Sequence, residues 1–125
     1  MSVEKFFREG MCKSTILVDG IPAAQHPNAI ESFDKLARSY PNIKTIIEIG
    51  TLFGGFSLFL GKYSEFGEAK VITYDIKKPE KSEEIKKYCD LRIKDCFSEG
   101  GKESIDLINL SERSLILCDG GNKIN

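Results

Sequence analysis

The middle of the chain alternates apolar runs with amphipathic segments, as a βαβ unit does. Residues 43–49 are β-branched and almost continuously apolar, which predicts a strand buried on both faces of a parallel sheet. A dense set of apolar residues from Gly55 to about Gly67 predicts a helix packed on that sheet. Residues 70–75 predict the second strand. The glycine-rich turn between the first strand and the helix is therefore the centre of this unit.

The segment before this unit predicts a hairpin and one amphipathic helix. An apolar run from Ser14 to Val18, an Asp-Gly turn and a short return through Ala23 predict a ragged hairpin, because proline weakens the second strand. Asn28 and Glu31 resemble a capping box, and apolar residues then recur at helical spacing through Ser39. Pro41 is expected to close that helix.

Further strands and helices follow in alternation. We expect a helix over 79–88, a short third strand over 91–94, a helix over 102–110 and a fourth buried strand over 114–118. Short connections between such elements imply an α/β fold of three layers, with a Rossmann-like, mostly parallel sheet, strand order 3-2-1-4 and helices on both faces. Residues 1–125 form one domain in this interpretation, with a lead-in over 1–27 and the core over 28–125.

Composition narrows the class of protein. With 41% hydrophobic and 30% charged residues and no long apolar window, the chain is expected to be soluble, with no membrane partner. A net charge of −1 argues against a nucleic-acid partner. The N-terminus shows no secretory signal, so we expect a cytoplasmic protein. Four scattered cysteines and a single histidine, His26, predict reduced thiols and no metal.

Acidic residues are expected at the carboxyl ends of all four predicted strands. They are Glu48, Asp75, Asp95 and Asp119. Ligands of doubly wound sheets bind at this edge, where the strand order reverses. Asp75 can accept the hydroxyl protons of a ribose, which makes an adenosine a suitable ligand.

The turn after the first strand predicts a ligand held against main-chain N–H groups. Gly50, Gly54 and Gly55 place no side chain in the way of such a ligand at the start of the next helix. The dinucleotide fingerprint Gly-x-Gly-x-x-Gly is absent, because Leu52 and Phe53 interrupt it. A cofactor without a pyrophosphate is therefore favoured.

The motif Glu48-x-Gly50-x-x-x-Gly54 resembles that of the class I S-adenosylmethionine-dependent methyltransferases. More narrowly, residues 20–27 and 46–57 resemble the branch of cephalosporin hydroxylase-like and rhamnosyl O-methyltransferase-like proteins. The resemblance covers about residues 16–123. That family has a seven-stranded sheet, so we expect this chain to correspond to its N-terminal, cofactor-binding half, without the C-terminal half of the sheet.

The resemblance implies a role for each matching position. Residues 48–55, among them Thr51, would line the methionine part of S-adenosylmethionine, and Asp75 would hold the ribose. Asp95, Cys96 and Phe97 would border the adenine. Asp119 would face the transferred methyl group as a tentative catalytic residue. The Gly-Gly-Asn-Lys that follows it replaces the family's histidine, so no metal is expected there.

Other interpretations of these residues remain open. Asp75, Asp95 and Asp119 can each cap a turn, and His26 is more readily a loop residue than a general base. A truncated or noncatalytic domain that binds cofactor or only oligomerises, and a nicotinamide-dependent oxidoreductase, are the alternatives to O-methyl transfer to a small molecule or sugar. An apolar fourth strand at the sheet edge also predicts a homodimer through that edge.

Overall fold

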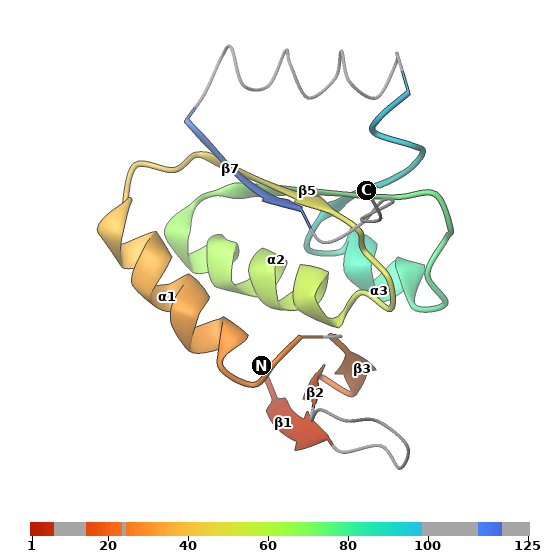
Figure 1. Ribbon diagram of the computed structural model, residues 1–125, viewed down its shortest axis with the longest axis horizontal. Coiled ribbons are helices and arrows are strands. Elements are labelled where there is room, and N and C mark those ends of the chain that lie inside the picture. Colours follow the sequence, from red (N-terminus) through yellow and green to blue (C-terminus); the bar gives the residue numbers. More distant parts are fainter. Residues whose placement is uncertain (7–14, 24, 99–112, 119–125) are drawn as a thin grey trace, which may run out of the picture.

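The computed structural model of the protein describes residues 1–6, 15–23, 25–98 and 113–118. In this part of the chain a small antiparallel sheet, a layer of helices and a four-stranded parallel sheet lie on one another (Figure 1). In chain order the elements are β1 (Val3–Phe6), β2 (Thr15–Val18), β3 (Ile21–Pro22), α1 (Ala29–Ser39), β4 (Thr45–Ile49), α2 (Gly55–Gly67), β5 (Lys70–Asp75), α3 (Ser82–Lys86), β6 (Asp90–Ile93) and β7 (Ser114–Cys118).

The larger sheet confirms an α/β fold with a parallel sheet. Its strands lie in the order β6-β5-β4-β7, and every described pairing among them is parallel. β4 is buried at all five positions, as its continuous apolar pattern predicts, because strands lie on both sides of it and helices cover one face. The register runs from Thr45 opposite Lys70 to Ile49 opposite Tyr74.

The fourth strand was expected to be buried and to form an edge of the sheet, and it is more exposed than expected. β7 pairs only with β4 among the described strands, so it lies at an edge. Ile116 is 42% exposed and Cys118 is also exposed. An apolar sequence alone cannot distinguish a central strand from an edge strand, because both carry the same hydrophobic residues.

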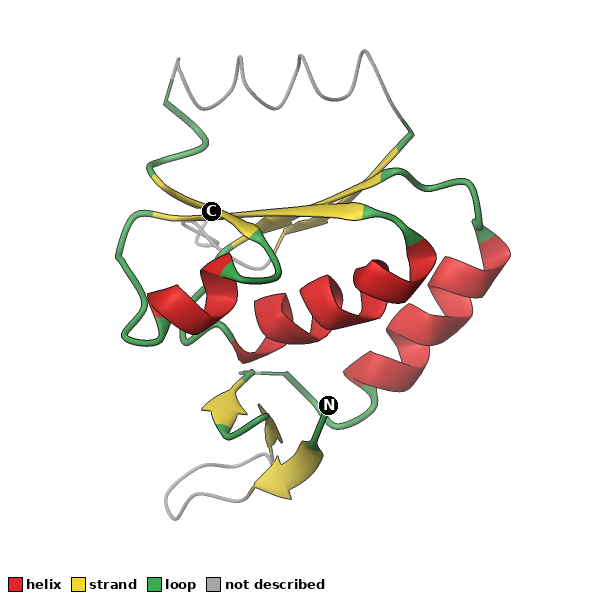
Figure 2. Ribbon diagram, turned by 180° about the vertical axis from the view of Figure 1, so that it is seen from behind, coloured by secondary structure: helices red, strands yellow, loops and turns green. Residues whose placement is uncertain are grey.

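All three described helices lie on the same face of the parallel sheet (Figures 1 and 2). Ile46 belongs to the core between that face and the helices, whereas Ile47 and Ile49 are buried on the opposite face. The helix predicted over 102–110, which would cover the opposite face, lies outside the described residues. None of the described helices is long and apolar enough to cross a membrane.

The lead-in is more regular than predicted. β1, which the sequence pattern did not reveal, pairs with β2, and β2 pairs with β3 in the predicted hairpin. Ile16 and Val18 are 1% and 0% exposed and belong to the core that α2 also forms. At the turn, Asp19 forms an ion pair with Lys62 of α2, which fixes the hairpin to the helix layer.

Helix boundaries differ locally from the predictions. Asn28 precedes α1 as expected, but its side chain makes no capping bond; its own N–H donates to Nδ1 of His26 at 3.1 Å. The capping box is therefore wrong, because Asn28 has helical backbone angles rather than the extended ones of a capping residue. The helix predicted over 79–88 is only α3, and β6 begins one residue earlier than the predicted third strand.

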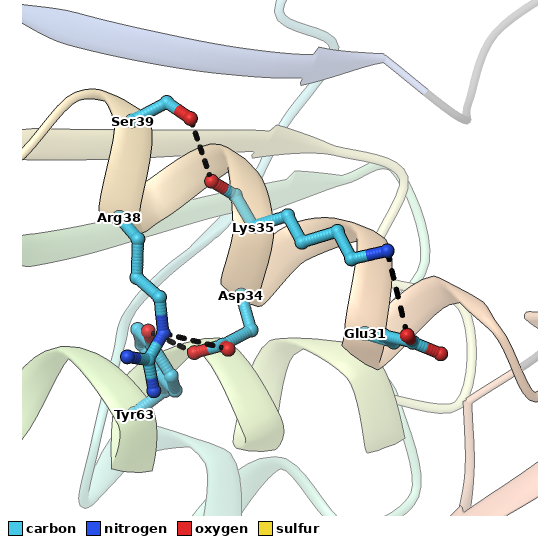
Figure 3. Close-up of polar contacts among 6 residues, drawn as sticks. All are labelled: Glu31, Asp34, Lys35, Arg38, Ser39 and Tyr63. Atoms are coloured by element: carbon cyan, nitrogen blue, oxygen red, sulfur yellow. Dashed lines mark hydrogen bonds and ion pairs between the residues drawn. The ribbon is translucent and has the colours of Figure 1, made fainter.

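α1 is joined to α2 by polar and aromatic contacts. Asp34 accepts hydrogen bonds from Tyr63 of α2 at 2.6 Å and from Arg38 at 2.9 Å (Figure 3). The ring of Phe33 packs edge-on against Tyr63, with centroids 5.3 Å apart, and against Phe59. This aromatic cluster fixes α1 beside α2 and thereby places the segment that leads into β4.

The hydrogen bond from Tyr63 to Asp34 should make the stability of the fold depend on pH at acidic pH. Tyr63, and then Arg38, lower the pKa of Asp34 below its ordinary value. A carboxyl group of this kind stabilises the fold above its unfolded pKa, and the contribution is lost as the pH falls through the folded pKa. Tyr63→Phe should therefore unfold at lower urea concentration than the unmodified protein at about pH 6, with the difference shrinking towards about pH 2. If the two proteins had the same urea midpoint as each other at both pH values, this prediction would be contradicted.

Candidate functional site

The glycine-rich turn joins the carboxyl end of β4 to α2 and is hydrogen-bonded to β5. The N–H groups of Gly50 and Thr51 donate to the carbonyl oxygen of Tyr74 at 2.8 and 3.2 Å. Gly50 and Gly54 have φ of 105° and 96°, which favour glycine, and Leu52 adopts a left-handed φ of 52°. The N–H of Leu52 donates to Oδ2 of Asp75 at 2.8 Å. The shape of the turn is therefore fixed by the end of β5.

Two of the three glycines in this turn make room for the protein's own chain. A Cβ on Gly55 would lie 2.3 Å from the carbonyl oxygen of Ile21 and 2.5 Å from that of Pro22, both in β3. A Cβ on Gly54 would lie 2.0 Å from Cδ1 of Ile85 in α3. The sequence pattern assigns both glycines to a ligand, but close packing of β3 and α3 already accounts for them.

Glu48 lies inside β4, on the face that α2 covers, and is 3% exposed. Its Oε1 accepts hydrogen bonds from the hydroxyls of Ser57 in α2 and Thr73 in β5, the latter at 2.8 Å. The hydroxyl of Thr51 lies 2.7 Å from that of Thr73. This buried polar cluster of Glu48, Thr51, Ser57 and Thr73 joins the turn to two strands and α2. Hydrogen bonding is what allows the carboxyl group to be buried.

An open cleft of about 450 Å³ lies at the carboxyl ends of β4, β5 and β6. Five of the nine residues predicted to bind cofactor line it: Gly50, Asp75, Asp95, Cys96 and Phe97. The other four, Glu48, Thr51, Gly54 and Gly55, do not. The structure therefore brings together the turn's first glycine and the loops after β5 and β6, as the sequence predicts. The remaining lining residues are Ile49, Leu52, Tyr74, Ile76 and Lys94.

Both acidic residues of the cleft also bond their own backbone. Asp75 accepts from Leu52 through Oδ2 and from the N–H of Lys77, at 3.1 Å, through Oδ1. Oδ1 of Asp95 accepts from the N–H of Phe97 at 2.9 Å. The bonds from Lys77 and Phe97 are the turn contacts that Asp commonly makes after a strand, whereas Leu52 lies in the glycine-rich turn. A carboxylate oxygen has more than one acceptor site, so Asp75 can still accept hydrogen bonds from a ligand.

Three exposed apolar side chains lie on the rim of the cleft. Leu52, Ile76 and Phe97 line it with exposed fractions of 50%, 68% and 62%. Leu52 and Phe97 belong to segments that the resemblance assigns to the cofactor, and Ile76 was not expected at a site. Large apolar side chains gathered at one exposed place mark surfaces that bind something. For Ile76 the available signal was its position directly after Asp75, the acidic end of β5.

A second cavity, of about 350 Å³, lies between α1 and the ends of β4 and β7. Glu48, Gln25 and Leu117 are among its lining residues. It is separated from the first cleft, with which it shares no lining residue. Asp119, the tentative catalytic residue, would follow β7 but lies outside the described residues.

The two buried thiols, Cys89 and Cys96, offer no reactive centre. Burial, with the nearby Glu48 carboxylate, raises the pKa of the Cys89 thiol to about 12. Burial likewise raises the pKa of Cys96. Both thiols therefore stay protonated and weakly nucleophilic near neutral pH. Within the described residues, no group of three or more His, Cys, Asp or Glu side chains is arranged to hold a metal ion.

Comparison of the chain with models of known protein families gives no match, and comparisons with proteins of known function and with solved structures give none either. The geometry of the cleft and the pattern of the sequence are therefore what bear on function.

Proposed function

We propose that the cleft at the ends of β4, β5 and β6 binds S-adenosylmethionine, and that the chain is a Rossmann-like, methyltransferase-like domain. The supporting observation is that Gly50, Asp75 and Asp95, from three separate segments, line one open cleft. That edge of an α/β sheet is where nucleotide ligands bind. The methyl acceptor proposed is an oxygen of a small molecule or sugar.

The residues of the cleft suit the parts of an adenosine. The carboxylate of Asp75 is placed to accept the ribose hydroxyls, because Leu52 and Lys77 orient it through its backbone contacts. Ile76 and Phe97 offer apolar surface to a planar base. Gly50 has no side chain, so a ligand can approach the main chain of the turn. Bound S-adenosylmethionine would supply the reactive methyl group, and the protein would position it.

Substituting Asp75 tests the proposal. Asp75→Asn keeps one side-chain oxygen for the N–H of Leu52 but loses the charge that strengthens bonds to ribose hydroxyls. Affinity for S-adenosylhomocysteine, measured by isothermal titration calorimetry, should fall about ten-fold. Asp90→Asn, at the start of β6 and outside the cleft, is the matched control and should bind normally. Absence of heat from the folded, unmodified protein would refute the proposal.

A domain that folds and transfers nothing is the second candidate. It is favoured by the internal roles of Glu48, Gly54 and Gly55, since hydrogen bonds within the protein account for Glu48 and close packing accounts for the two glycines. Cofactor binding without turnover on any acceptor would support it. Fluorescence titration with reduced nicotinamide cofactor separates both from an oxidoreductase, which would bind that cofactor more tightly than S-adenosylhomocysteine.

We further propose that β7 pairs with a second copy of the chain. Among the described strands β7 pairs only with β4, and Ile116 is exposed on it, so its other edge can accept a strand of a second chain. Ile116→Lys should place a charge on that edge and convert a dimer to a monomer in light scattering at tens of micromolar. An unmodified protein that is already monomeric under those conditions would contradict the pairing.

A further inference from the structure

A larger cavity, of about 650 Å³, lies beside the proposed cofactor cleft. Three segments distant in the sequence line it: the hairpin turn with Gly20 to Pro22, the tip of the glycine-rich turn with Leu52 and Phe53, and the loop from Lys77 to Lys81. Its volume lies in the range of small-molecule sites. Leu52 and Asp75 line both the cofactor cleft and this cavity, so ligands bound in the two would be neighbours.

The wall formed by the loop before α3 is positively charged. Lys77, Lys78 and Lys81 line the cavity, and none of them forms an ion pair with another described residue. The acidic side chains that follow are engaged elsewhere: Glu83 pairs with Lys86 at 3.5 Å and Glu84 with Lys87 at 3.2 Å. The whole chain has a net charge of −1, so this is a local excess of lysine.

Acidic groups in the cavity do not cancel the lysines. Glu80 and Asp75 also line it, which leaves three positive charges against two negative ones. Both oxygens of Asp75 already accept backbone N–H groups, from Leu52 and Lys77. An anion held by the ammonium groups would meet three positive and two negative groups, and the exposed side chain of Glu80 can turn away from it.

The cavity also has apolar lining residues. Phe53 is 58% exposed at the tip of the turn, beside Leu52, whose left-handed backbone helps to set the direction of the tip. Ile21 and Pro22 of β3 continue this surface. An aromatic ring held in solvent next to lysines offers a ring face as well as charge to a ligand.

We propose that this cavity binds an anionic small molecule carrying an apolar ring, with Lys77, Lys78 and Lys81 holding its phosphate or carboxylate and Phe53 contacting its ring. Lysine ammonium groups bind phosphates and carboxylates as point charges. This site goes beyond the cofactor cleft, and its occupation does not depend on S-adenosylmethionine. If the cleft binds that cofactor, the neighbouring cavity is where an anionic methyl acceptor would lie.

Titration of the full chain with phenyl phosphate, followed by NMR of the backbone amides, tests the site. Inorganic phosphate, benzoate and phenol are the comparison probes, all at one ionic strength. We expect saturable shifts in the amides of 52–53 and 77–81, with phenyl phosphate binding more tightly than inorganic phosphate and phenol not saturating. Comparing the affinity for phenyl phosphate with that for benzoate then shows whether the site prefers a phosphate or a carboxylate.

Two sets of lysine variants make the test specific. Lys77→Gln, Lys78→Gln and Lys81→Gln together should weaken phenyl phosphate binding about ten-fold. The matched pair Lys86→Gln and Lys87→Gln, outside the cavity, should leave it unchanged. Phe53→Ala should weaken the binding of phenyl phosphate but not that of inorganic phosphate. No saturation by phenyl phosphate, or equal losses in the two lysine sets, would overturn the proposal, whether or not the cleft binds S-adenosylhomocysteine.

Discussion

Gly55→Ala should lower the free energy of unfolding by about 2 to 3 kcal/mol, the cost of overpacking a close contact. The new Cβ would lie 2.3 Å from the carbonyl oxygen of Ile21 and 2.6 Å from the carbonyl carbon of Pro22. These are backbone atoms, so no side-chain rotation relieves the contact. β3 must instead move away from α2, which loosens the packing of the hairpin on the helix. Urea unfolding of the purified variant measures the loss.

Gly67→Ala is the matched control in the same helix. Gly67 is the last residue of α2, and a Cβ built there meets no atom within 4 Å. Alanine at this position should be neutral or raise stability by about 0.5 to 1 kcal/mol, because it lowers the backbone entropy of the unfolded chain. If both variants had the same stability, the approach of β3 would not be the reason for glycine at position 55.

Glu48→Ala should lower the free energy of unfolding by about 3 kcal/mol, because two buried hydroxyls lose their acceptor together. Ser57 and Thr73 are both 0% exposed, so water does not replace the lost oxygen without opening the core. Their remaining partners are each other, at 3.3 Å, and Thr51 for Thr73. Chemical denaturation of the variant, compared with the unmodified chain, gives the cost.

Glu48→Gln separates a structural role from a direct ligand contact. The amide keeps one carbonyl oxygen that the hydroxyls can donate to, so this variant should be more stable than Glu48→Ala. Since Glu48 does not line the cofactor cleft, the folded glutamine variant should bind S-adenosylhomocysteine as the unmodified chain does. A variant that keeps its stability but loses binding would show that Glu48 contacts the cofactor.

These two residues show why finding a motif does not by itself establish what each of its members contacts. Glu48 and Gly55 belong to the pattern that suggested a methyltransferase, and the turn lies where that pattern predicts. Their side-chain environments depend on segments remote in the sequence: β3 approaches Gly55, and Ser57 with Thr73 surrounds Glu48. A spacing of glycines and acids does not report which of them face a ligand and which face the protein.

Local patterns were sufficient where one element decides its own structure. The β-branched run of β4, the strand ending in Asp75 and the helix beginning at Gly55 all lie where the sequence predicts, because burial and glycine content are written in neighbouring residues. The same holds for the hairpin around Asp19 and Gly20. The carboxylates after β5 and β6 followed from those strand ends.

Only the tertiary structure decided what depends on contacts between distant segments. β1 has a weak local pattern and exists as a strand because β2 pairs with it. The exposure of Ile116 depends on β7 lying at an edge, which no residue within β7 encodes. The cofactor cleft and the neighbouring cavity form where loops from separate strands meet. The sequence therefore determined most of the described elements and the acidic residues at the ends of β4, β5 and β6, and packing decided which side chains remained available to a ligand.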